Sequence, residues 1–159
     1  MPSVLVTPVI DLSVRDLCRK PYPGHPFGCP NWGRRDTCPP RAPRFDRVID
    51  LAKPVWAIYN AFDLAGHVDR MREAHPDWSW RQLVCCLYWQ KGARNTLEAE
   101  LAQWLFQRAA LGESGYQIFR VPEACGVNVT ETMASVGVHL EWPPIRVAYQ
   151  VALAGTAKE

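Results

Sequence analysis

The feature that most constrains the fold is a proline-rich stretch between residues 21 and 43. It contains seven of the fourteen prolines of the chain, together with Gly24, Gly28 and Gly33. Proline lacks an amide donor and fixes φ, so neither a helix nor a central strand tolerates this density. A structureless segment of this length is uncommon in a domain and is usually functional. Because it buries little apolar surface, we expect another kind of interaction to fasten it.

The length, hydrophobic fraction and net charge of the chain are typical of one globular domain. The chain has 159 residues, a hydrophobic fraction of 48% and a formal net charge of +2. This length favours a single domain, 1–159, with its own core. The charge balance indicates no class of partner by itself. No apolar run approaches the roughly 18 residues of a membrane span, and the N-terminus lacks the basic start of a signal peptide. We therefore expect no membrane contact and a cytoplasmic location.

Strands and helices are predicted on both sides of the proline-rich stretch. Runs rich in β-branched and aromatic residues predict strands at 4–10, 55–62, 116–121 and 146–153. Apolar spacing predicts helices at 45–52, 66–76 and 130–136, and a long helical region after residue 79. Their alternation predicts an α/β or α+β fold, with a small mixed sheet of about four strands packed with helices, plus a Pro/Cys-rich loop.

The long helical region contains two signals that predict where it is divided. Gly92 is expected to interrupt the helix, because glycine lowers helix stability. Asn95 followed by Glu98 resembles a capping box, which predicts the start of a second helical segment. At the start of the region, either Asp77 or Ser79 can act as the helix cap.

Three of the six cysteines, Cys18, Cys29 and Cys38, surround or lie in the proline-rich stretch. In a reducing compartment, clustered cysteines bind metal more often than they form disulfides. Thiolates are soft donors suited to zinc, iron or an iron–sulfur cluster. Proline follows both Cys29 and Cys38, as it follows the last cysteine of the bacterial ferredoxin ligand run. We expect the three cysteines to bind a metal; the alternative is three reduced thiols that bind nothing.

The sequence leaves the fourth ligand open. Structural zinc takes four protein ligands, and His25 would complete a Cys₃His site with the three cysteines. A 4Fe-4S cluster held by three cysteines would instead leave one iron open to a substrate. A distant cysteine could close that position, and Cys125 is the candidate because it follows a predicted strand.

Cys85 and Cys86 form a separate pair on the predicted long helix. Adjacent residues on a helix point about 100° apart, so both rarely bind one metal. We expect at least one of them to pack in the core beside Leu83 and Leu87, rather than to act as a ligand.

Arginines are concentrated between residues 31 and 47. One interpretation is an anion site beside the metal, formed by Arg34, Arg35 and Arg41, with Trp32 available for stacking. Such a site could take a phosphate, a carboxylate or a nucleic-acid backbone. The other interpretation, a solvated loop whose arginines pair locally, is favoured because arginines in an irregular loop do not define a groove.

The run CPNWGRRDTCPP, from Cys29 to Pro40, resembles the C-x-x-Y-G-x-x-x-x-C-P-P signature of an uncharacterised family of prokaryotic predicted metal-binding proteins. The V-R-x-x-C run ending at Cys18 and the P-E pair at Glu123 are similar to two further family motifs. The resemblance implies metal binding by the loop cysteines and implies no particular reaction. Trp32 replaces the usual tyrosine. The family also has a downstream cysteine-rich segment, and the corresponding stretch of this chain is shortened. If that segment supplies a metal ligand in the family, this chain has either lost the ligand or replaced it with Cys125.

Three functional hypotheses follow. The first is a small iron–sulfur protein that transfers electrons to a redox partner or activates an anionic small molecule. The second is a zinc-stabilised module that contacts an anionic partner through the arginines, with nucleic acid the less supported choice. The third is a metal-free scaffold. The sequence does not determine whether the protein is an enzyme, or what its substrate or partner is.

Overall fold

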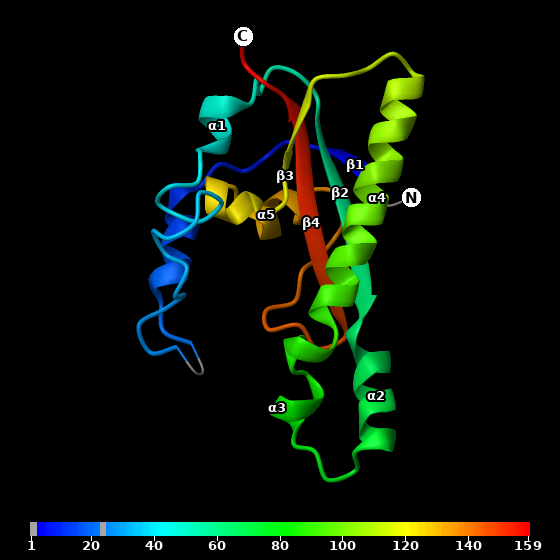
Figure 1. Cartoon of the computed structure of the whole chain (residues 1–159). Helices are drawn as coiled ribbons and strands as arrows, with labels where there is room; N and C mark the ends of the chain where they lie inside the picture. The colour runs from blue at the N-terminus through cyan, green and yellow to red at the C-terminus, as the bar shows by residue number, and fades with distance from the viewer. Residues whose placement is uncertain (1–2, 23–24) are drawn as a thin grey trace.

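The computed structural model describes residues 3–22 and 25–159. Its centre is a four-stranded antiparallel sheet in the order β1-β2-β4-β3, as seen in Figure 1. The strands are β1 (Ser3–Val6), β2 (Val55–Asp63), β3 (Tyr116–Phe119) and β4 (Val147–Thr156). The expected α+β class and the four strands are confirmed. The sheet is antiparallel in every pairing and not mixed.

The helical elements lie between the strands. The α-helices are α1 (Phe45–Val48), α2 (Leu64–Ala74), α3 (Trp80–Leu83), α4 (Gln90–Ala110) and α5 (Val129–Ala134). The 3₁₀ helices are η1 (Leu12–Arg19), η2 (Cys86–Tyr88) and η3 (Pro122–Cys125). No helix in the described part of the chain is long and apolar enough to cross a membrane.

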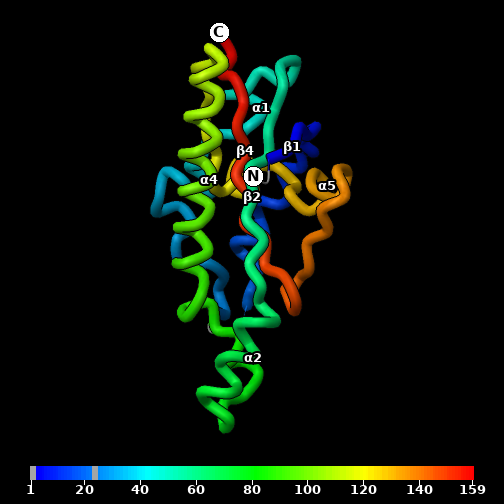
Figure 2. Tube along the Cα trace, turned by 90° about the vertical axis from the view of Figure 1, so that its right-hand side faces the viewer, coloured from blue at the N-terminus to red at the C-terminus, as the bar shows by residue number. Residues whose placement is uncertain are grey.

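The sheet separates two layers of helices. Figure 2 shows α4 and α5 on opposite sides of β2 and β4. On the α4 side, Leu97, Leu101 and Trp104 pack against the sheet. The β4 residues beneath them include Ala152 and Ala154, whose small side chains leave room for these large ones. This close packing holds the longest helix flat along the sheet.

The other face of the sheet carries the larger core. Alternate residues of β4, Val151 and Leu153, point to this side because side chains alternate along a strand. They are covered by residues of α1, η3 and α5, including the fully buried Phe45 and Met133. Ala42, at the end of the proline-rich stretch, also enters this core, so the stretch is anchored at its C-terminal end.

The helix break predicted at Gly92 is wrong. α4 runs through Gly92 and Asn95 without interruption. A glycine in a helix costs about 1 kcal/mol, and burial of the apolar face of α4 outweighs that cost. Glu98 does not cap a helix, because its carboxylate pairs with Arg120 at 2.5 Å. The chain breaks earlier, between α3 and α4, where the indole N–H of Trp89 donates to the carbonyl of Val84.

The first strand is shorter than predicted and leaves the sheet after Val6. Ile10 pairs instead with Val127 in an isolated bridge. The amide of Asp11 donates to the carbonyl of Gly126 over 2.9 Å. These contacts place η1 beside η3 and bring together two segments that are far apart in the sequence.

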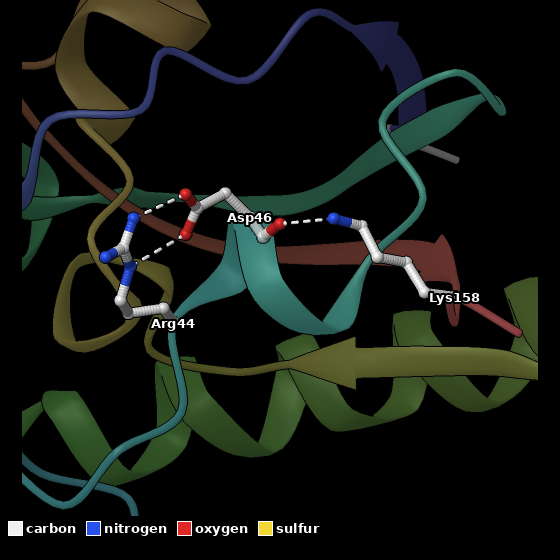
Figure 3. A network of polar contacts seen from close by, with 3 residues as sticks. All are labelled: Arg44, Asp46 and Lys158. Carbon is white, nitrogen blue, oxygen red and sulfur yellow. Dashed lines mark hydrogen bonds and ion pairs between the residues drawn. The ribbon is translucent and has the colours of Figure 1, made fainter.

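The end of the proline-rich stretch is fixed to the C-terminal strand through α1. The Arg44 guanidinium donates two hydrogen bonds to the Asp46 carboxylate, over 3.0 and 2.6 Å, and Lys158 Nζ donates to the Asp46 carbonyl over 2.8 Å (Figure 3). The Arg44 guanidinium lowers the pKa of Asp46. The expected helix over 45–52 is a single turn because Ile49 already pairs with Ala157.

Candidate metal centre

η1 presents Cys18 and is held from two sides. Gly126 has φ +87° and lies so close to η1 that a Cβ there would be 2.6 Å from Leu12 Cδ2. On the other side, Arg15 donates to the carbonyls of Pro40 and Ala42, each over 2.9 Å. Arg15 therefore ties η1 to the end of the proline-rich loop and brings Cys18 to the same region as Cys29 and Cys38.

The backbone of Cys29 lies directly against that of Cys18. The Cys29 amide donates to the Cys18 carbonyl over 2.6 Å. Gly28, at φ +84°, has no side chain to prevent this approach, since a Cβ there would lie 2.6 Å from the same oxygen. Cys38 sits in a turn in which its amide bonds to the Arg35 carbonyl and its carbonyl accepts from the Ala42 amide.

The other two loop cysteines act on the charge state of Cys18. Burial raises the pKa of Cys18, and the thiolates of Cys29 and Cys38 raise it further. Like charges repel, so thiolates at Cys29 and Cys38 disfavour the deprotonated form of Cys18. A metal ion reverses this effect, because its positive charge favours the deprotonated form of every coordinating thiol. The chemistry of this donor set therefore fits a thiophilic metal.

These thiols are neighbours without forming a closed ligand cage. Over residues 3–22 and 25–159, no group of three or more His, Cys, Asp or Glu side chains is close enough to hold one metal ion. All six cysteines of the chain are described and all are free thiols.

The pKa of Cys125 is not affected by the loop cysteines Cys29 and Cys38. It is 7% exposed, and burial raises its pKa to about 11. Arg15 acts to lower that pKa and Glu123 to raise it, whereas Cys29 and Cys38 do not contribute. Cys29 and Cys38 thus act on Cys18, whereas neither acts on Cys125, which is buried in the core.

Glu123 affects both Cys18 and Cys125, and its position was not predicted as part of the site. Its charge raises the pKa of both Cys18 and Cys125. Burial raises its own pKa. The signal available in the sequence was the P-E pair of the family motif, in which Glu123 directly precedes the segment that bears Cys125.

His25 packs on a tyrosine. It is exposed, it pairs with Tyr22 in an isolated bridge, and the centroids of the two rings are 4.6 Å apart. The pKa of Tyr22 is raised by partial burial and then by the charges of Cys29 and Cys18. Tyr22 is a second neighbour of the site that sequence reasoning missed.

The arginine-rich part of the loop is only partly paired. Arg41 Nε lies 3.4 Å from Asp36, with both side chains largely exposed. Arg34 and Arg35 are exposed and form no ion pair with the residues that the structure describes. The guanidinium of Arg19 lies over the ring of Trp32, 5.4 Å from its centroid. One face of Trp32 is therefore covered by a cation from η1.

A largely apolar cavity of about 380 Å³ adjoins this region. Val14 and Leu17 of η1 line it, and Leu17 immediately precedes Cys18. Glu123 and Trp142 form other parts of its wall. A ligand in this cavity would lie next to the element that carries Cys18.

Cys85 and Cys86 lie at the break between α3 and α4. Cys85 is half-buried and Cys86 is exposed. Leu83 is buried as expected, but Leu87 is 85% exposed, so the expected core around both leucines is wrong. The chain leaves its helical path at Val84, which turns the following residues toward solvent.

Comparison of the chain with protein-family models, with curated proteins and with solved structures finds no match. The resemblance to the predicted metal-binding family remains a prediction from the residues quoted above.

Proposed function

We propose that the protein binds an iron–sulfur cluster, 4Fe-4S, through Cys18, Cys29 and Cys38. The observation that carries the proposal is that Cys29 and Cys38 both raise the pKa of Cys18, while the Cys29 amide donates to the Cys18 carbonyl. Thiolates are the usual ligands of such clusters. When bound, the cluster would supply one-electron transfer or an iron site that activates a substrate.

The surrounding residues support a cluster with a ligand from outside the chain at the fourth position. Cys125 responds to Arg15 and Glu123 and not to the loop thiols, so it is the less supported fourth ligand. The cavity at Leu17 and Glu123 gives a small molecule access to this region. The three cysteines would hold the cluster, while Arg15 keeps η1 against the loop. A reducing compartment, the cytoplasm by expectation, would keep the thiols free.

Metal analysis tests the proposal directly. We expect protein purified without oxygen to be brown and to contain iron and acid-labile sulfide. Cys29→Ala should lose most of the iron, whereas Cys86→Ala, an exposed cysteine outside the site, should keep it. A colourless anaerobic preparation with one zinc per chain would contradict the cluster.

One further variant tests whether Cys125 is the fourth ligand. Cys125→Ala should retain the iron and sulfide of the native protein if a substrate or solvent occupies the fourth position. Loss of iron in Cys125→Ala, in a variant that still unfolds cooperatively, would make Cys125 a ligand. The unfolding measurement is needed because Cys125 also packs in the core.

The alternative is a zinc-stabilised module held by Cys18, His25, Cys29 and Cys38. Arg34 and Arg35 are exposed and form no ion pair within the described part of the chain, which favours an anionic partner for this module, such as a phosphate group. Stacking would use the face of Trp32 opposite Arg19. In this case His25→Ala should release the zinc, and unchanged zinc content in that variant would exclude the module.

A further inference from the structure

A larger cavity, of about 550 Å³, lies where β2 runs into α2. Figure 1 shows this end of β2 beside α2 and the start of α4. The residues that line it come from β2, α2, η2 and α4, and none is a cysteine or belongs to the proline-rich loop. The cavity is therefore separate from the candidate metal centre.

Gly92 lines this cavity and has no packing reason to be glycine. It lies inside α4 with helical backbone, and a Cβ added there would meet no atom within 4 Å. Glycine destabilises a helix relative to alanine, so a glycine without a close neighbour needs another explanation. Gly66 in α2 offers the contrast, because the Asp63 carboxylate occupies the space where its Cβ would be. Space left open beside Gly92 is space that a ligand can fill.

His67 supplies a polar group that the protein leaves unpaired. The side chain lines the cavity, yet the residue is only 8% exposed, and its Nε2 is buried without a hydrogen-bond partner in the described chain. Burial, and then the neighbouring Arg70, lower the pKa of His67, so the imidazole is neutral near pH 7. Buried polar atoms are normally satisfied, which makes this nitrogen a candidate for a ligand contact.

Arg70 supplies a positive charge at the same cavity. It is exposed and forms no ion pair with residues 3–22 or 25–159. The Asp63 carboxylate also lines the cavity but forms no ion pair with Arg70, and its Oδ1 accepts the Gly66 amide at 2.9 Å and caps α2. Arg70 therefore remains available for a carboxylate or phosphate, which guanidinium groups bind with charge-assisted hydrogen bonds.

The opposite wall is aromatic and rigid. Phe62 and Trp89 stack with ring centroids 4.9 Å apart and planes 11° apart. The hydrogen bond from Trp89 Nε1 to Val84 fixes the indole further. Tyr88 adds a third aromatic ring to the lining. Such a wall favours a planar, apolar ligand body.

We propose that this cavity binds a small aromatic anion, with a carboxylate or phosphate monoester at Arg70 and its ring in the space between Gly92 and the aromatic wall. The site is independent of the metal proposal, because it shares no residue with it.

The test is an NMR titration of ¹⁵N-labelled protein with phenyl phosphate and, separately, with benzoate. We expect both anions to shift the Gly92 amide and the Trp89 indole N–H. Benzylamine, which carries the opposite charge, should bind more weakly. Arg70→Gln should weaken phenyl phosphate roughly tenfold or more, as expected for loss of a charge-assisted contact. Arg72→Gln, an exposed arginine of the same helix outside the cavity lining, should not.

Gly92→Leu separates a binding role from a structural one. Leucine is a good helix former, so the variant should unfold at equal or higher denaturant concentration while its side chain fills the cavity and abolishes anion binding. Three results would each overturn the proposal: no shifts in the native protein at millimolar anion, stronger binding of benzylamine than of benzoate, or unchanged affinity in a folded Gly92→Leu variant.

Discussion

The amide of Cys29 donates a hydrogen bond to the carbonyl oxygen of Cys18 over 2.6 Å. This bond joins η1 to the proline-rich loop through the backbone, at two residues that we propose as metal ligands. Gly28 permits it, because any side chain at that position would meet the Cys18 and Arg19 backbone at 2.6–2.8 Å. The backbones of the first two cysteines are thus held together by a main-chain hydrogen bond.

Gly28→Ala should therefore damage the metal centre more than Gly33→Ala. Both glycines have positive φ, which costs a non-glycine residue about 1–2 kcal/mol. Only Gly28 adds a clash with backbone, since the nearest atom to a Cβ at Gly33 is 3.9 Å away. Metal content per chain after anaerobic purification checks this. Equal metal loss in the two variants would show that the close approach is unimportant.

Thr132→Val should destabilise the connection that positions η1. Thr132 is fully buried, and its hydroxyl accepts from the Val9 amide at 2.9 Å and donates to the Asn128 carbonyl at 2.7 Å. Valine keeps the shape but leaves the Val9 amide without this partner, which costs about 1–3 kcal/mol, whereas the Asn128 carbonyl still accepts the Thr132 amide. Urea unfolding measures the loss. Thr132→Ser keeps the hydroxyl and should therefore retain the part of the unfolding free energy that comes from its hydrogen bonds.

Arg108→Met should lower the free energy of unfolding by about 0.5–2 kcal/mol, the range of a partly buried cation–π contact. The Arg108 guanidinium carbon lies 4.0 Å from the ring centroid of Trp56 and 5.3 Å from that of Trp104. Methionine preserves the apolar stem but removes the cation. Denaturant unfolding followed by circular dichroism gives the change. Arg72→Met, at an exposed ion pair, is the control and should change stability by less than about 0.5 kcal/mol.

Glu141 should make the fold sensitive to acid. The amides of Arg146 and Ile145, followed by the Arg146 side chain, lower the pKa of Glu141 from 4.5 to about 2. Because the folded-state pKa lies below the unfolded value, the ionised carboxylate stabilises the fold above pH 4.5. That contribution is lost as the pH falls through this window toward about 2.

Glu141→Gln should consequently be less stable than the native protein at neutral pH and approach it in acid. Urea unfolding from neutral pH down to about 2 checks this. Glu73→Gln, an exposed glutamate on α2, provides the charge-matched control. A difference between Glu141→Gln and native protein that stays constant with pH would contradict the assignment.

Local chemistry predicted several elements well. β2 begins at Val55 as expected, because a dense β-branched and aromatic run follows Pro54. Ser79 caps α3, with a capping box to Gln82. The division of the long helical region was predicted at the wrong place because the choice between Gly92 and Val84 depends on contacts with β2 and β4. Trp89 stacks on Phe62, and no local pattern encodes that partner.

The sequence by itself determined that residues 21–22 and 25–43 form neither a long helix nor a central strand, because proline geometry acts within a few residues. It also determined which thiols belong to that loop. Only the tertiary structure decided that Glu123 acts on the pKa values of Cys18 and Cys125, and that Cys29 and Cys38 act on Cys18 but not on Cys125. These relationships depend on the pairing of Ile10 with Val127, which joins segments more than a hundred residues apart. Such contacts are selected by burial and hydrogen bonding of the whole chain, and no local stretch specifies them.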